Sequence, residues 1–352
     1  MLLENVWPYI QDGGFYLWLA GALFFIIRLG VFSPKSLVAA PARQSSLSLP
    51  VVGAVIVLYF MMQALTLSGG FGLGWITPVD VYGASRDVAS QPTATTRAAT
   101  TLATVPATAA GTASAPAPPA STQAAAPPAV SVRTTVAVSA IDGIAKLLSV
   151  VLVVVFLPRF FKDRAAGWGL HPRQFPAGAF KGVFGFLLTF PVLIVFADAL
   201  MRMYALFNHE MSEHTFFEAM KQQITLAQST VLCVSAVVVA PIAEELFFRG
   251  IVQTTLIQYS WGMVIPQLVR PSAAFFSMPQ EYRPSPLHRW GAILVTSAFF
   301  AWQHQHDQAP IIFVLSIGLG YVYERTGNLW APMALHLAFN STEIATFFAV
   351  PQ

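Results

Sequence analysis

The sequence predicts an all-α protein that crosses a membrane several times. Two observations support this prediction, the composition of the chain and its long apolar segments. Of the 352 residues, 55% are hydrophobic and 10% are charged, and the mean hydropathy is +0.62. Soluble domains carry about a quarter charged residues, so this chain lacks the polar surface to face water. Several apolar segments can cross about 30 Å of hydrocarbon at 1.5 Å per residue. We therefore expect a multi-pass transmembrane helical bundle in the cell membrane.

Eight apolar segments are candidates for membrane-spanning helices. The first four are expected at about residues 15–32, 51–67, 140–157 and 177–200. The fifth is expected at about residues 229–257 with a bend at Pro241, and the last three begin near residues 290, 310 and 329. The last six follow closely on one another, so we expect them to pack as one C-terminal bundle.

A segment of different composition separates the second and third of these helices. Residues 88–132 contain one charged residue, Arg97, a single Leu, and no Ile, Phe, Met, Trp or Tyr. Such a segment cannot bury enough apolar surface to offset its chain entropy, so it is predicted to be a disordered tether. The chain then divides into an N-terminal two-helix membrane segment at 1–80, the Ala/Thr/Pro/Ser-rich tether at 81–135, and the C-terminal bundle at 136–352.

The charge balance and the single cysteine exclude two kinds of site. The net charge of +3 and the pI near 9.1 come from basic residues in short loops between apolar segments. These residues form no basic stripe, so we expect no nucleic-acid partner. We read them as signals that set the orientation of the helices in the membrane, and we expect membrane lipid as a partner. Cys233 is the only cysteine, so neither an internal disulfide nor a cysteine metal site is expected.

Three ionisable residues stand together in the fifth segment, in the sequence APIAEELFFRG. An ionisable side chain at bilayer depth costs at least about 2.5–3.5 kcal/mol on insertion scales, so such a group needs a partner or a function. Glu245 and Arg249 are four residues apart and can pair on one helix face. Glu244 is rotated by about 100° from Glu245 and can face the bundle interior, where a carboxylate suits a general base. The alternative is a structural ion pair at a helix end.

Two later segments add histidines and an amide. In SAFFAWQHQHD, Phe300 and His304 lie on one helical face and His306 is nearby. In APMALHLAFNST, His336 and Asn340 are four residues apart on a segment that is otherwise apolar. These side chains fit a proton donor or metal ligand beside an oxyanion donor. They also fit interhelical hydrogen bonds worth about 0.6–2 kcal/mol, which would have a packing role only.

The combination of these motifs, in this order on successive helices, resembles a known family. The motifs are similar to those of the CPBP group of CAAX-protease and bacteriocin-processing intramembrane proteases, which includes the type II CAAX prenyl endopeptidases. They are Glu244-Glu245-x-x-x-Arg249, Phe300-x-x-x-His304 and His336-x-x-x-Asn340. The resemblance covers residues 229–345 closely and does not cover the N-terminal helices or the tether.

The resemblance implies an intramembrane endopeptidase, a hydrolase that acts on peptide bonds with CAAX-type processing. In this picture Glu244 activates the water molecule. His304 and His336 orient the water or the substrate carbonyl, or bind a metal ion, and Asn340 helps to hold the oxyanion. The expected partner is a membrane-associated protein or peptide substrate, and the resemblance leaves open whether that substrate is lipidated.

The metal requirement is also left open by the resemblance. Glu245 and Arg249 shape and charge the site in this picture. Two His and one Glu would be an adequate zinc set with one open position, so His304 and His336 are the candidate ligands of a divalent metal, as in a metalloprotease. Glu244 cannot easily be both ligand and base, however, so a metal-independent glutamate mechanism is the other interpretation.

Two other classes of function remain open. A non-enzymatic, immunity-type membrane protein could bind a peptide in the same polar cavity, and it would keep its function when His304 or Asn340 is replaced. A proton-coupled transporter could use intramembrane Glu and His side chains as a proton relay. That class predicts an inverted repeat between the halves of the bundle, and the sequence has no such internal symmetry.

The signatures of other protease classes are missing from the sequence. The stretch HEMSEH places His209 and His214 five residues apart, whereas the zincin pattern needs a spacing of four, so we expect an exposed acidic loop. The sequence also lacks the Gly-x-Ser-x-Gly motif of serine hydrolases and the Gly-x-Gly-Asp motif of aspartyl intramembrane proteases.

Overall fold

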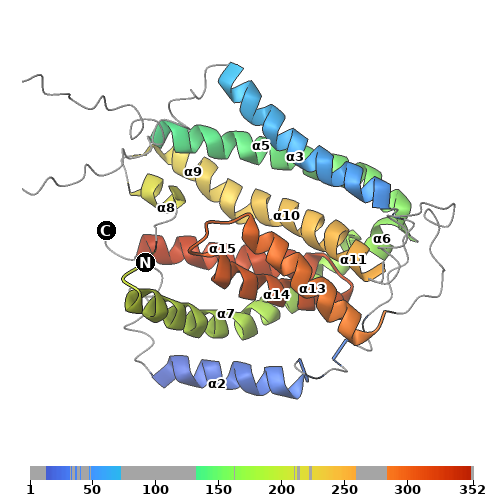
Figure 1. Ribbon diagram of the computed structural model, residues 1–352, viewed down its shortest axis with the longest axis vertical. Helices are drawn as coiled ribbons and strands as arrows, with labels where there is room; N and C mark the ends of the chain where they lie inside the picture. The colour runs from blue at the N-terminus through green and yellow to red at the C-terminus, as the bar shows by residue number, and fades with distance from the viewer. Residues whose placement is uncertain are drawn as a thin grey trace, which may run out of the picture.

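The structure is a computed structural model in which the described residues form a helical bundle (Figure 1). It describes residues 13–72, 132–258 and 284–349, apart from short gaps at 32, 34–35, 38–39, 41–46, 48, 162, 210, 212–214 and 222–223. These residues include no β-strand. The predicted all-α membrane bundle is confirmed, and its location in the cell membrane in particular stays a prediction.

Helices occur at all eight of the predicted positions. They are α2 (Gly13–Arg28), α3 (Leu49–Gly72), α5 (Val132–Phe156), α7 (Phe175–Leu206), a fifth helix from Leu226 to Gln258, α13 (Pro286–Trp302), α14 (Ala309–Thr326) and α15 (Trp330–Ala349). Within the described part of the chain, three helical stretches are long and apolar enough to cross a membrane: Val136–Phe160, Arg164–Leu206 and Leu226–Gln258. The number of eight spans therefore stays a prediction.

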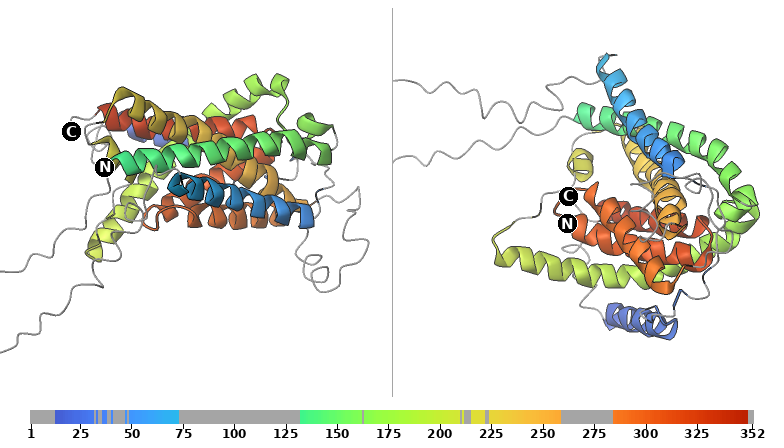
Figure 2. Two further views of the ribbon diagram at one scale, coloured as in Figure 1. Left: turned by 90° about the horizontal axis from the view of Figure 1, so that it is seen from above. Right: turned by 45° about the vertical axis from the view of Figure 1, so that its right-hand side comes forward.

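The two N-terminal helices pack on opposite sides of the bundle. Helix α3 lies beside α5 at one edge, and α2 lies beside α7 at the other edge (Figures 1 and 2). The indole N–H of Trp18 on α2 donates to the carbonyl of Leu187 on α7 at 2.8 Å. Helix α5 begins at Val132, so it includes the last four residues of the predicted tether, and the remainder, 81–131, lies outside the described residues.

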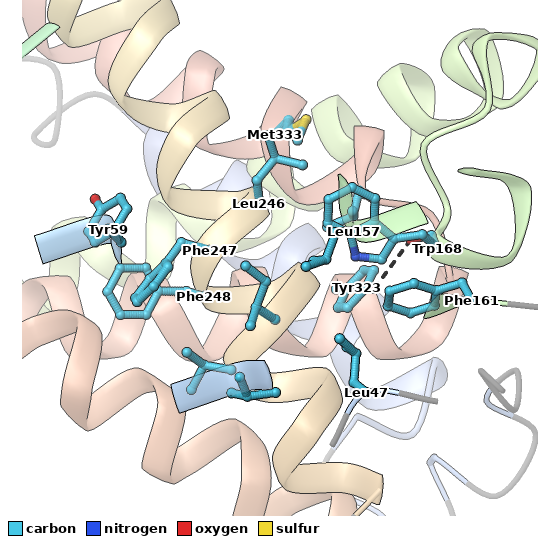
Figure 3. Close-up of a cluster of buried hydrophobic side chains, with 14 of the residues drawn as sticks. Leu47, Tyr59, Leu157, Phe161, Trp168, Leu246, Phe247, Phe248, Tyr323 and Met333 are labelled. Atoms are coloured by element: carbon cyan, nitrogen blue, oxygen red, sulfur yellow. Dashed lines mark hydrogen bonds between the residues drawn. The ribbon is translucent and has the colours of Figure 1, made fainter. Parts of the chain in front are cut away.

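Buried aromatic side chains fill the contact between α3 and the fifth helix. Tyr59 of α3 stacks on Phe247 with ring centroids 4.1 Å apart, and Phe248 meets Phe247 edge to face (Figure 3). Stacked and edge-to-face pairs of this kind add about 0.5–1.5 kcal/mol to the gain from burial. The contact therefore attaches α3 to the segment that carries Glu244 and Glu245.

A second buried aromatic explains the glycine that ends the APIAEELFFRG motif. Trp168, at the end of the short helix α6 (Arg164–Trp168), is fully buried and donates from its indole nitrogen to the carbonyl of Gly250 at 3.0 Å. A Cβ atom at Gly250 would lie 2.8 Å from atoms of this indole ring. A larger residue at this position would push the fifth helix away from Trp168.

Small residues allow α7 and α15 to approach closely. A Cβ atom at Gly182 would lie 2.7 Å from the Cβ atom of Ala334, and one at Gly178 would lie 2.6 Å from the Cβ atom of Trp330. Glycines four residues apart are typical of close helix contacts in membranes, because they let the backbones approach. This contact places α15, the helix that carries His336 and Asn340, against α7.

We predict that Gly182→Leu destabilises the bundle by at least about 1–3 kcal/mol, because the new side chain overpacks the contact between α7 and α15. Thermal unfolding of the detergent-solubilised protein, followed by tryptophan fluorescence, measures the effect. The matched control is Gly53→Leu on α3, where no atom lies within 4 Å of an added Cβ. Equal unfolding temperatures for Gly182→Leu and the unaltered protein would contradict the close contact.

Candidate functional site

The fifth helix departs from α-helical geometry on both sides of the Glu pair. It consists of α9 (Leu226–Val234), a π-helical turn at Ser235–Val239, α10 (Ala240–Glu245), a longer π-helical stretch at Leu246–Gln253, and α11 (Thr254–Gln258). Such π-helical turns occur frequently at functional sites in proteins. Glu244 and Glu245 therefore lie at the end of the short α-helical segment α10, which is flanked by two π-helical stretches.

Pro241 leaves one carbonyl of this helix without its backbone donor. In the first π-helical turn, the N–H of Ala240 donates to the carbonyl of Ser235, five residues earlier. The next donor in this register would be residue 241, which is a proline and has no N–H. The free carbonyl of Ala236 instead accepts a hydrogen bond of 2.7 Å from the side-chain amide of Asn340 on α15. Asn340 therefore replaces the backbone donor that Pro241 removes.

The predicted pair of Glu245 and Arg249 is present and fully buried. The Nη1 atom of Arg249 lies 3.0 Å from Oε1 of Glu245, and both side chains are 0% exposed. The Nη2 atom of Arg249 donates to the side chain of Ser316 on α14 at 2.7 Å and to its carbonyl at 3.2 Å. The guanidinium carbon also lies 4.7 Å from the centroid of the Phe300 ring. One buried cation thus links the fifth helix to α13 and α14.

His336 connects both glutamates. Its Nδ1 atom lies 3.0 Å from Oε1 of Glu245, and its Nε2 atom lies 4.0 Å from Oε2 of Glu244. A neutral imidazole that donates from Nδ1 to Glu245 carries no proton on Nε2, so Nε2 can accept a hydrogen bond. A water molecule beside Glu244 would then meet two acceptors, the carboxylate and the imidazole nitrogen.

His304 lies two residues beyond the end of α13. Its Nδ1 atom lies 2.8 Å from the carbonyl of Phe300, four residues earlier, and the two rings are 4.8 Å apart. The ring of Phe300 also lies 5.8 Å from the ring of His336. Phe300 is buried and forms the shared wall between the two histidines, which explains its place in the second motif.

Four of the six predicted site residues line one cavity of about 970 Å³: Glu244, His304, His336 and Asn340. The other two, Glu245 and Arg249, lie behind it in the protein interior. His306 is exposed and does not line the cavity. His209 is exposed, lines the cavity and pairs with Asp307 at 2.9 Å. Residues 210 and 212–214 of the HEMSEH stretch lie outside the described residues, so the expected acidic loop stays a prediction.

Sequence reasoning missed Lys146, which is in direct contact with Glu244. Its Nζ atom lies 3.1 Å from Oε1 of Glu244 and 3.0 Å from Oδ2 of Asp142, one helical turn earlier on α5. The signal was present, because Asp142 and Lys146 are charged residues in the apolar third segment. Glu343, three residues after Asn340 on α15, also lines the cavity and was also missed, although it too is a charged residue in an apolar segment.

The arrangement of these side chains does not fit a zinc ion held by His304 and His336. Among the residues that the structure describes, no three His, Cys, Asp or Glu side chains form a group that could hold a metal ion. One oxygen of Glu244 is already bound by the ammonium of Lys146. A metal cation at this carboxylate would be repelled by that ammonium at close range.

Comparison with known proteins agrees with the motifs. Residues 226–342 match the family model described as type II CAAX prenyl endopeptidase Rce1-like, which supports membership in the CPBP family. The matched segment contains all six predicted site residues and leaves out α2, α3, α5 and α7. No curated protein and no solved structure matches the chain.

We predict that Asn340→Ala destabilises the protein by about 0.5–1.5 kcal/mol, because the half-buried carbonyl of Ala236 loses its donor. The same substitution should cost less in a Pro241→Ala background, where residue 241 supplies an N–H to that carbonyl. Thermal unfolding of the four proteins of this cycle in detergent gives the coupling between the two positions. An equal cost of Asn340→Ala in both backgrounds would contradict the assigned compensation.

Proposed function

We propose, from the match of residues 226–342 to the Rce1-like model of type II CAAX prenyl endopeptidases, that Glu244 activates the hydrolytic water of an intramembrane endopeptidase. The family supports a CAAX-type membrane protease in general. The roles of individual residues and the identity of the substrate belong to the proposal.

One observation carries the proposal. Side chains from three separate helical segments line the same cavity: Glu244 from the fifth helix, His304 just after α13, and His336 and Asn340 from α15. A purely structural role for each of them would not require that they share one cavity. A cavity lined by a base, two imidazoles and an amide is suited to acyl transfer to water.

The proposed reaction begins with a water molecule between Glu244 and His336. As Glu244 takes one proton, the water oxygen forms a bond to the carbonyl carbon, and the π electrons of the carbonyl move to its oxygen. When the tetrahedral intermediate collapses, the C–N bond breaks and the leaving nitrogen takes the proton from Glu244. The products are a carboxylic acid and an amine, so atoms and charges balance.

The other cavity residues are assigned to orientation and charge stabilisation. The Nδ1 contact of His336 with Glu245 keeps its Nε2 atom available to accept a proton of the water. His304 is assigned to orienting the substrate carbonyl. Asn340 donates one N–H to Ala236, and its second N–H is assigned to the developing oxyanion.

The cavity suits a peptide substrate in a membrane. Phe190, Leu193 and Ile194 of α7 form an apolar wall, and Glu244 and Asn340 lie on the polar side. Ligand sites generally combine apolar walls with few polar groups in volumes of about 300–1,000 Å³. We assign the substrate to the class of membrane-associated proteins or peptides, in which an apolar segment lies next to the bond that is cut.

We predict that Glu244→Gln lowers cleavage by about 10²–10⁴-fold, because glutamine cannot accept the proton of the water. Purified protein in liposomes, incubated with a peptide library and read by mass spectrometry, measures cleavage. The control is Glu218→Gln, an exposed glutamate on helix α8 (Thr215–Met220) that does not line the cavity. Normal cleavage by Glu244→Gln at normal abundance would refute the assigned base.

The same assay separates the enzyme from a non-enzymatic peptide binder. A binder keeps its peptide affinity and shows no cleavage in any variant, including the unaltered protein.

We predict that cleavage persists when the protein is treated with a metal chelator, because Glu244 is paired with Lys146 and the described residues form no three-residue metal set. The assay with the peptide library is run with chelator, without it, and with zinc added after the chelator is removed. Loss of cleavage that zinc restores would contradict the glutamate mechanism and would return His304 and His336 to the role of ligands.

A further inference from the structure

We infer that Lys146 is a positioning residue for Glu244, and that helix α5 thereby completes the site from outside the segment that the family model matches. This inference rests on the proposed role of Glu244 as the base. It assigns Lys146 an action through Glu244, without contact to the reacting atoms.

The contact between Lys146 and Glu244 is close and sheltered. The Nζ–Oε1 distance is 3.1 Å, and each side chain is 13% exposed. Lys146 is held at its other side by Asp142, four residues earlier on α5. Charge-assisted hydrogen bonds are roughly twice as strong as neutral ones, and their strength increases where water is scarce. The ammonium is thus fixed between two carboxylates from two different helices.

The packing of α5 explains why Lys146 reaches Glu244. Gly143 faces the first π-helical turn so closely that a Cβ atom there would lie 3.0 Å from the Oγ atom of Ser235. The hydroxyl of Ser235 in turn donates to the carbonyl of Ser139 at 3.5 Å. Ser139, Gly143 and Lys146 recur every three or four residues, so they lie on one face of α5. This face is the one that meets the fifth helix.

Helix α3 covers the contact on its outer side. Tyr59, which is 4% exposed, stacks on Phe247 and lines the cavity together with Lys146 and Glu244. Gln63, one turn later on α3, lines the same cavity. Helices α3 and α5, which precede the matched segment, therefore contribute Tyr59, Gln63 and Lys146 to the cavity that Glu244 lines.

The geometry gives the two carboxylate oxygens of Glu244 different surroundings. Oε1 accepts from Lys146, whereas Oε2 points toward His336, whose Nε2 atom is 4.0 Å away. A carboxylate without such an anchor rotates about its last side-chain bond and exchanges the two oxygens. The ammonium therefore directs Oε2 toward the position assigned to the water, and misplacement of a catalytic group by about 1 Å can cost about 10²-fold in rate.

The test compares Lys146→Met and Lys146→Arg with the unaltered protein in liposomes, on a library peptide that the unaltered protein cuts. We expect Lys146→Met to lower kcat by about tenfold to a hundredfold, with KM changed by less than about twofold. Lys146→Arg keeps the charge and should recover most of the lost kcat. The matched control is Lys181→Met, which removes an exposed lysine on α7.

A double variant keeps the test valid if Lys146→Met folds poorly. Without the ammonium, the carboxylates of Asp142 and Glu244 lose the cation that they share, which destabilises the folded protein. Adding Asp142→Asn removes one of these charges. We expect Asp142→Asn/Lys146→Met to unfold at a higher temperature than Lys146→Met and to show the same loss of kcat.

Each other result overturns the inference in a distinct way. A normal kcat in both Met variants makes Lys146 a structural partner only, and a raised kcat makes it an inhibitory contact. A change in KM alone assigns Lys146 to substrate binding, and a loss that Arg does not recover excludes positioning by charge. If Glu244→Gln also cuts the peptide normally, the proposed function itself fails, which is a separate result.

Discussion

A buried ion pair between Glu245 and Arg249 is the interaction on which the rest of the site depends. Both side chains are inaccessible to solvent, so each needs its partner and further hydrogen bonds to offset the loss of hydration. Ser316 on α14 and His336 on α15 supply these bonds. They therefore fix the rotation of the fifth helix about its axis relative to α14 and α15. Because Glu244 precedes Glu245 by one residue, this setting also directs Glu244 into the cavity.

The fifth helix combines this rigid pair with irregular turns. Two π-helical stretches flank Ala240–Glu245, and Pro241 removes a backbone donor inside the membrane-spanning segment. In hydrocarbon a freed carbonyl is costly, so a neighbouring helix must supply the donor. Asn340 does so, which means that a residue assigned to chemistry also maintains the backbone next to the base. Asn340 therefore has both a structural role and a proposed role in the mechanism.

Much of this arrangement follows from periodicity in the sequence, and some of it does not. The eight helices, the pair of Glu245 with Arg249, and the common cavity of Glu244 with three residues from later segments were predicted. The contact between Glu244 and Lys146 joins residues 98 positions apart. Its existence depends on how α5 packs on the fifth helix, which local spacing does not encode. The π-helical turns were likewise missed, because hydrophobic spacing does not distinguish a π-helical turn from an α-helical one.

The origin of the cavity walls has a consequence for how this protein can be divided. Tyr59 of α3, Lys146 of α5 and Phe190 of α7 all precede the matched segment, and all face the same interior space. The segment at 226–342 is therefore not an autonomous module that could be excised or transplanted into another scaffold with its pocket intact. A compound that inserts between Tyr59 and Phe247 would displace the cavity wall next to Lys146 and Glu244.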